Sequence, residues 1–346
     1  MYRRFVKISL VLVYLVIIAG AMVRMTGSGM GCPDWPKCFG YYIPPTTATE
    51  LEWEPGRNFK KGQVIIHEQA LQVAKTDFKT SQSYNPSNWQ PYTKHDYATF
   101  NVWHTWIEYI NRLFGALAGV AIFIMALFSI KKWRTSNRVT LLSWLSVFLL
   151  GFQAWLGATV VYSVLDPIKI TIHMVMALVI VAVLLYLLYF SKEHHEIYFA
   201  STKFKILLLV ALILTLIQVV LGTQVREFVD TQIDIIGYTA RSLWLENPTL
   251  EFYLHRSFSV IVVLINLLLW YLNRNKKFGF RKLNLLILLL FAEAFTGIAM
   301  YYFDFPFLSQ PLHLILASLF FGLQFYILLE AFQSHNPNGT REPKSL

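Results

Sequence analysis

The chain has 346 residues, of which 55% are hydrophobic, 16% aromatic and only 14% charged, and its formal net charge is +10. A soluble domain carries about a quarter charged residues, and a disordered chain is poorer in large apolar side chains, so both classes are excluded. Two cysteines are too few for a disulfide scaffold or an all-cysteine metal cluster. The positive charge is sparse and lies between long apolar segments. This pattern indicates a polytopic membrane protein and no nucleic-acid partner.

Eight apolar segments are each long enough to cross a bilayer, which takes roughly 17–25 helical residues. They are continuous rather than alternating, and lipid requires each backbone polar group to be paired, so we expect helices rather than barrel strands. The predicted fold is therefore an all-α membrane protein with eight transmembrane helices. The segments are Ile8–Met25, Leu113–Ile130, Leu141–Leu165, Ile170–Phe190, Ile206–Val225, Leu254–Leu272, Leu283–Phe303 and Phe305–Leu329.

The Lys and Arg residues between these segments predict the orientation. With the N-terminus in the cytoplasm, the cytoplasmic segments hold 17 basic residues against the acids Glu193, Glu196, Glu330 and Glu342. The positive-inside rule then places both termini in the cytoplasm. The lack of an Arg- and Ser-rich transit segment favours the plasma (inner) membrane of a bacterium. The basic residues are Arg3, Arg4, Lys7, Lys131, Lys132, Arg134, Arg138, Lys192, Lys203, Lys205, Arg274, Lys276, Lys277, Arg281, Lys282, Arg341 and Lys344.

The second half of the chain repeats the first. The matches are Ile170–Ala177 with Gln310–Ala317, Gln153–Gly157 with Glu293–Gly297, Tyr109–Arg112 with Tyr253–Arg256, and Gly20–Arg24 with Gly222–Arg226. We predict two pseudo-repeated four-helix bundles, residues 1–190 and 191–346, with one binding site in each. The first apolar segment also resembles a cleaved signal peptide, but the repeat requires it as a helix.

The first outer loop, about residues 26–106, is polar, aromatic and rich in proline. It is too long for a plain connector, and we predict that it forms a cap. Cys32 and Cys38 lie in it, on the oxidising side of a bacterial membrane. We interpret them as a disulfide that closes a small loop; free thiols or a redox-active pair are the alternative.

Three histidines, His173, His255 and His313, occupy equivalent depths near the outer ends of their helices, and the fourth equivalent position is Asn111. A single membrane histidine is most often a hydrogen-bonded packing residue. The repeat, however, pairs His255 with His313 at one depth in one bundle. Two facing neutral imidazoles are the usual axial pair of a low-spin haem b. Zinc is less favoured, because no cluster of Cys, Asp or Glu accompanies them.

Four arginines lie at the same outer level, against the positive-inside bias: Arg24, Arg112, Arg226 and Arg256. One interpretation is that they extend to lipid phosphates. The other is that they pair with haem propionates, two in each half, because the planar guanidinium suits a carboxylate. Because the arginines recur in both halves of the repeat, we favour haem propionates over lipid phosphates as their partners.

Glu108 lies three residues before Asn111, so both share a helix face, and its repeat counterpart is Phe252. An acid in only one half indicates that this half performs proton chemistry; the alternative is a solvated acid that complements the helix dipole. His104, one turn earlier, either joins the site or caps the helix. Glu293, the one acid in the middle of a helix, is either functional or makes an interhelical hydrogen bond.

These residues resemble the haem A synthase family over all eight helices. The resemblance is carried by Arg24–Cys38, Glu108–Arg112, Thr171–His173, His255–Arg256 and Pro311–His313. It implies an oxidoreductase that converts the C8 methyl of haem O to a formyl group, giving haem A for cytochrome oxidase. It implies haem b bound by His255 and His313, with Arg226 and Arg256 nearby. Its partners would be the haem O substrate, haem O synthase, an electron partner and the lipid bilayer.

The resemblance also implies a disulfide between the two cysteines and places haem O in the N-terminal half. Glu108 would be the essential acid, with His173, Arg24 and Arg112 around the substrate. The family has a second histidine in this half where this chain has Asn111. We hypothesise that His173 is the sole protein ligand and that Asn111 hydrogen-bonds an iron-bound water or the porphyrin edge.

Two other functions fit a membrane haem protein. A bis-His b-type cytochrome would only transfer electrons, but such carriers often stack two haems at two depths, and the candidate ligands here lie at one depth. A haem transporter or chaperone is less favoured, because the sequence has no pair of Gly- or Pro-broken helices at mid-membrane.

Overall fold

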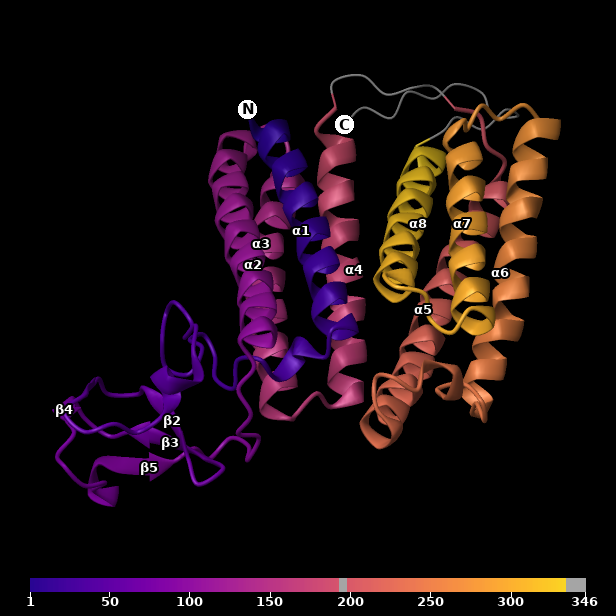
Figure 1. Cartoon of the computed structure of the whole chain (residues 1–346). Helices are drawn as coiled ribbons and strands as arrows, with labels where there is room; N and C mark the ends of the chain where they lie inside the picture. Colours follow the sequence, from indigo (N-terminus) through magenta and orange to yellow (C-terminus); the bar gives the residue numbers. More distant parts are fainter. Residues whose placement is uncertain (193–197, 334–346) are drawn as a thin grey trace. The chain divides into compact units, whose positions relative to one another are not determined.

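The computed structural model describes residues 1–192 and 198–333. Within them, eight helices are long and apolar enough to cross a membrane, which confirms the predicted class (Figure 1). Five charged residues used for the orientation, Glu193, Glu196, Arg341, Glu342 and Lys344, lie outside the described residues. The helices are α1 (Tyr2–Met25), α2 (Val102–Ser129), α3 (Asn137–Tyr162), α4 (Pro167–Phe190), α5 (Thr202–Ile236), α6 (Leu250–Asn275), α7 (Lys282–Tyr302) and α8 (Ser309–Phe332).

The start of α2 differs from the prediction. The helix begins at Val102 rather than Leu113, so the first outer loop ends at residue 101 and its predicted end at residue 106 is wrong. The side-chain oxygen of Asn101 accepts hydrogen bonds from the backbone N–H groups of Trp103 and His104, at 2.9 and 3.2 Å. An amide in this position satisfies the donors of a helix start. The early turns are polar, so a criterion based on apolar segments does not include them. Glu108, Asn111 and Arg112 lie in these turns, on the helix that their spacing predicted.

The chain divides into two compact units. One contains residues Met1–Leu10, Met125–Ser146 and Ala177–Leu346; the other contains Val11–Ile124 and Val147–Met176. The second unit therefore holds the outer loop, the C-terminal parts of α1 and α3 and the N-terminal parts of α2 and α4. The division into halves after residue 190 and the pseudo-repeat stay predictions.

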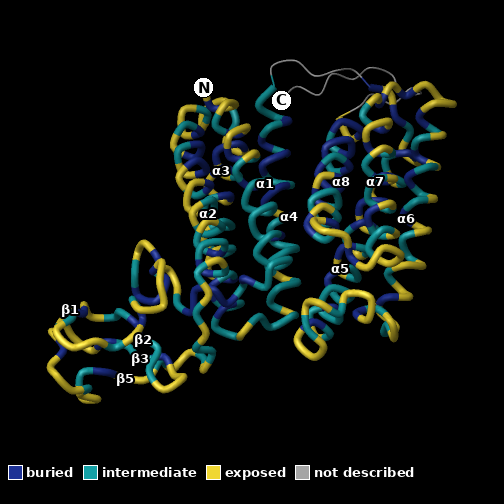
Figure 2. Tube along the Cα trace, viewed as in Figure 1, coloured by how far each residue is buried: buried dark blue, intermediate teal, exposed yellow. Residues whose placement is uncertain are grey.

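In the first unit, α5 packs against α6 and α8, and α7 packs against α8. Helix α8 is the most buried of the eight spans, and Figure 2 shows exposed stretches along α6 and α7. Large apolar side chains such as Leu264 of α6 and Leu288 of α7 are exposed. Exposed aliphatic faces of this kind suit lipid tails. Gln324 of α8 donates to Asn266 of α6 at 3.0 Å, which pairs two buried amides.

The outer loop is a folded element with five short strands (Figure 1). β1 (Asn58–Phe59) pairs antiparallel with β4 (Phe78–Lys79). β2 (Val64–His67), β3 (Ala70–Ala74) and β5 (Trp89–Pro91) form an antiparallel sheet in that order. The β2–β3 hairpin turns at Glu68 and Gln69, which both have positive φ as a tight hairpin turn requires. The strands cover two small cores, one around Leu51 and Leu71 and one around Phe59 and Trp89. The cap function of this element stays a prediction.

Candidate functional site

The two cysteines form a disulfide, Cys32–Cys38, which confirms the first interpretation of this pair. Both are buried. The loop that they close lies on the first turns of α2, where the Thr105 hydroxyl donates to the Gly31 carbonyl at 2.7 Å. A Cβ at Gly31 would lie 2.3 Å from the backbone oxygen of His104, so only glycine permits this approach. His104 therefore contributes its backbone to the loop contact.

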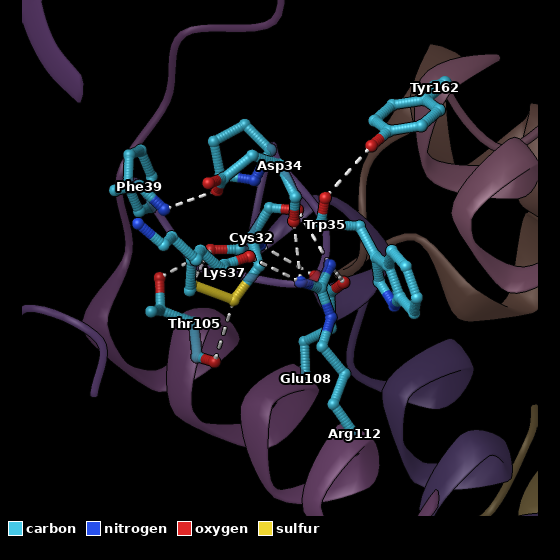
Figure 3. Close-up of polar contacts among 12 residues, drawn as sticks. Cys32, Asp34, Trp35, Lys37, Phe39, Thr105, Glu108, Arg112 and Tyr162 are labelled. Carbon is cyan, nitrogen blue, oxygen red and sulfur yellow. Dashed lines mark hydrogen bonds and ion pairs between the residues drawn. A yellow bond between two sulfur atoms is a disulfide. The ribbon is translucent and has the colours of Figure 1, made fainter. Parts of the chain in front are cut away.

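Glu108 and Arg112 are held by this loop (Figure 3). The Glu108 carboxylate accepts from the Cys32 N–H at 2.7 Å and forms an ion pair with Arg112 one turn later. Only 4% of Glu108 is exposed, which does not fit a solvated acid at a helix start. A buried charge needs a partner and hydrogen bonds, and Glu108 has both. The structure thus unites Glu108, Arg112 and the disulfide loop.

The Arg112 guanidinium is the centre of the loop contacts. Nη1 donates to the carbonyl oxygens of Asp34 and Lys37, at 2.6 and 2.8 Å, and Nη2 donates to that of Cys32 at 3.1 Å (Figure 3). Five donors in a rigid fork allow such multiple contacts, which a lysine cannot reproduce. In the structure, Arg112 contacts these carbonyls and Glu108. Its predicted contact with a haem propionate stays a prediction.

Asp34 closes the same loop from the other side. Its carboxylate accepts from the backbone N–H groups of Phe39 and Gly40, at 2.5 and 2.8 Å. Burial raises the pKa of the Asp34 carboxyl, while the two N–H donors and the Arg112 charge oppose that rise. Tyr162 of α3 donates to the Trp35 carbonyl at 3.2 Å, which attaches the loop to a second helix (Figure 3).

Asn111 and His173 carry buried polar atoms without hydrogen-bond partners among the described residues. These atoms are Asn111 Oδ1 and His173 Nδ1. A Cβ at Gly20 of α1 would lie 3.9 Å from Asn111 Oδ1, and one at Gly157 of α3 would lie 3.3 Å from His173 Cε1. Buried polar atoms are normally satisfied, so those left over here suit a ligand.

His255 of α6 and His313 of α8 face each other with ring centroids 6.4 Å apart and ring planes at 73°. Metal–imidazole bonds are about 2.0–2.1 Å and a ring centroid lies about 1.1 Å behind its nitrogen, so two axial rings on one metal have centroids roughly 6.3 Å apart. The observed separation therefore fits one iron between the two imidazoles. The described residues contain no cluster of three or more Cys, Asp, Glu and His that would suit another metal.

A glycine on the neighbouring helix approaches each of these imidazoles. A Cβ at Gly222 would lie 3.0 Å from His255 Cε1, and one at Gly297 would lie 3.3 Å from His313 Cε1. A Cβ at Gly157 would approach the ring of His173 in the same way. A polar residue precedes each glycine by four positions: Gln153, Gln218 and Glu293. Gln153 donates to the His173 carbonyl at 2.9 Å and Gln218 to the His255 carbonyl at 3.1 Å. The role of Gln218 was not predicted, although the repeated spacing of a polar residue and glycine is visible in the sequence.

Residues 3–325 match the sequence pattern of COX15-CtaA, described as cytochrome oxidase assembly protein. The chain belongs to this family. A protein of Shewanella oneidensis named heme A synthase is 27% identical over 219 residues, which are 62% of this chain and 54% of that protein. The aligned region thus spans about half of that relative. A protein of the same name from Bacillus licheniformis is 23% identical over 338 residues, 93% of each chain. One from Rickettsia africae is 22% identical over 347 residues.

The other three arginines that were expected near haem propionates lie on α1, α5 and α6 of this COX15-CtaA member. Arg226 of α5 pairs with Asp230 at 2.6 Å and donates to Gln310 of α8. Arg256 of α6 lies 5.7 Å from the ring centroid of Tyr301. Arg24 is in the last turn of α1. Their predicted contacts with propionates stay predictions.

Proposed function

We propose that this protein is a haem A synthase, an oxidoreductase that converts the C8 methyl of haem O to the formyl group of haem A. Membership of a cytochrome oxidase assembly family supports this, as do the names of the relatives. The observation that carries the proposal is the asymmetry of the two half-sites. One has two imidazoles at the spacing of an axial pair, with the Glu293 carboxyl on one of them. The other has one imidazole, that of His173, and its acid, Glu108, is buried on α2 against the disulfide loop.

The C-terminal half-site would hold haem b as a resident cofactor. His255 and His313 would be its axial ligands, and their centroid distance of 6.4 Å fits that role. When bound, haem b supplies one-electron redox chemistry to the protein. Gly222 and Gly297 let the neighbouring helices approach the two rings closely. Arg226 and Arg256 would neutralise the propionates.

The N-terminal half-site would bind haem O as substrate. His173 would be its protein ligand, and Asn111 would hydrogen-bond an iron-bound water or the porphyrin edge. Oxidation of a methyl group to a formyl group takes up an oxygen atom from water or dioxygen, requires an electron acceptor, which would be the separate electron partner, and releases protons. Glu108 is a buried carboxylate available to take up protons. Arg112 orients Glu108 and fixes the disulfide loop over the first turns of α2. Arg24 would meet the substrate propionates.

The cellular setting follows from the same proposal. Both termini would lie in the cytoplasm, with the two haem sites near the outer face of a bacterial plasma membrane. Haem O synthase would supply the substrate, and a separate electron partner would exchange electrons with the resident haem b.

The test is to express the protein in cells that make haem O and to separate the extracted haems by chromatography. We expect haem A with the wild-type protein, none with Glu108→Ala, and wild-type amounts with Glu54→Gln. Glu54 is a suitable control because it is an exposed acid of the outer loop. A wild-type protein that contains haem b but forms no haem A with any redox partner would overturn the proposal and support an electron-transfer cytochrome.

A further inference from the structure

Two side chains of α7 contact one nitrogen of His313. The Thr296 hydroxyl oxygen lies 2.9 Å from Nδ1, and the Glu293 carboxyl oxygen Oε1 lies 3.2 Å from it. The Thr296 hydroxyl donates its hydrogen to the Glu293 backbone carbonyl at 2.8 Å. A hydroxyl has only one hydrogen, so toward His313 this oxygen acts as an acceptor. In this arrangement of hydrogens, Nδ1 carries the hydrogen and Nε2 keeps its lone pair for a metal.

The carboxyl group of Glu293 lies within the membrane span α7, where an acidic side chain is energetically unfavourable. Acidic side chains within a membrane span are rare and normally have a functional partner. Its Oε1 is directed at His313, and its Oε2 has no hydrogen-bond partner in the part of the chain that the structure describes. The two other helices whose glycine approaches a histidine ring, α3 and α5, carry an uncharged amide at this position, Gln153 and Gln218. A glutamine therefore fits this position of the helix, so packing alone does not explain why α7 has a glutamate.

His173 and His255 lack this pair of acceptors among the described residues. Leu156 and Leu221 stand where α7 has Thr296. His173 Nδ1 has no partner among the described residues. His255 has the Gln218 side-chain amide beside both ring nitrogens, 3.1 Å from Nδ1 and 3.5 Å from Nε2, and has no carboxylate there. Among the three imidazoles, only that of His313 has an acidic side chain and a hydroxyl on the same nitrogen.

We propose that Glu293 and Thr296 are positioning residues for His313. They fix its tautomer and ring orientation and make Nε2 a stronger donor to the haem b iron. Hydrogen bonds from a ligating imidazole to a carboxylate raise the basicity of the ligand. A stronger donor stabilises the oxidised iron, so this pair lowers the midpoint potential of haem b. The inference rests on the cofactor site of the proposed function.

The test is a redox titration of haem b in the purified full-length protein, together with its ferric EPR spectrum. In Glu293→Gln we expect the ratio of reduced to oxidised haem at a fixed ambient potential to rise about tenfold, by analogy with effects of outer-shell partners on metal sites. For a one-electron couple that equals about 59 mV. Thr296→Val shifts the potential in the same direction, and Thr296→Ser, which keeps the hydroxyl, does not.

The outcomes separate this inference from the proposed function. A wild-type protein without a bis-His haem would refute the cofactor site itself. Wild-type haem b with an unchanged potential and EPR spectrum in both Glu293→Gln and Thr296→Val would overturn the inference alone. If Glu293→Gln loses haem, the comparison of Thr296→Val with Thr296→Ser decides: equal haem content and potential in these two contradict the inference, and a difference supports it.

Discussion

The two half-sites use the same helix contact but differ in the groups around it. In each, a glycine of one helix approaches the imidazole of the next, as Gly157 does for His173 and Gly297 for His313. In the C-terminal half, the imidazole nitrogen has acceptors on α7. In the N-terminal half, the corresponding nitrogen has none among the described residues, and a buried acid lies on α2 instead. The difference supports one site that keeps its haem and one that exchanges it.

Removing one imidazole from each half gives the largest expected effect. In His255→Ala, the low-spin haem b spectrum should disappear, because one axial ligand is lost. In His173→Ala, that spectrum should persist while haem A formation stops. Optical spectra of the purified proteins and chromatography of extracted haems measure both quantities. An unchanged haem b spectrum in His255→Ala would contradict the assignment of the halves.

Arg112→Lys tests the contacts between α2 and the disulfide loop. Lysine cannot reproduce the donors that reach Asp34, Lys37 and Cys32. Hydrogen bonds to charged groups are worth roughly 1.5–3 kcal/mol, so the loss of one corresponds to at least about tenfold. We expect haem A formation to fall by about that factor while the haem b spectrum is unchanged. Equal losses in both readouts would mean that the residue acts through global folding.

Gly31→Ala examines how closely the disulfide loop must approach α2. The new Cβ would lie 2.3 Å from the His104 carbonyl oxygen, and overpacking of this kind typically costs about 1–3 kcal/mol. We expect a lower thermal unfolding temperature and reduced haem A formation. Gly115→Ala on the same helix is the control, since nothing lies within 4 Å of its Cβ. Equal unfolding temperatures of the two variants would refute the close contact.

Asn111→His gives the smallest expected effect and makes the two halves more alike. Gly20 leaves space beside this side chain, since a Cβ there would lie 3.9 Å from Asn111 Oδ1. We expect haem A formation to be retained, with a bis-His spectrum for the bound substrate haem. Activity and spectra of the haem O-loaded variant measure this. Loss of activity would mean that the amide itself is required.

The sequence predicted the existence of the helices better than the positions of their ends. It predicted which residues belong to the candidate sites better than the contacts that these residues make. Long apolar segments identify a span, but the first turns of α2 and the last turns of α5 are polar and continue beyond the apolar region, so both ends were missed. The strands of the outer loop are short and pair over few residues, which leaves a weak periodic signal. The contacts of Arg112 with loop carbonyls and of Thr296 with His313 depend on side-chain directions that spacing does not give.

The central claim is that one half keeps haem b while the other converts haem O, and the haem content of Glu108→Gln tests it most directly. Glutamine keeps the size and an acceptor of the side chain but cannot take up a proton as the carboxylate does. From cells that make haem O, the purified variant should yield haem b and unconverted haem O, and no haem A. Haem A at the wild-type level, or loss of haem b together with haem O, would contradict the account.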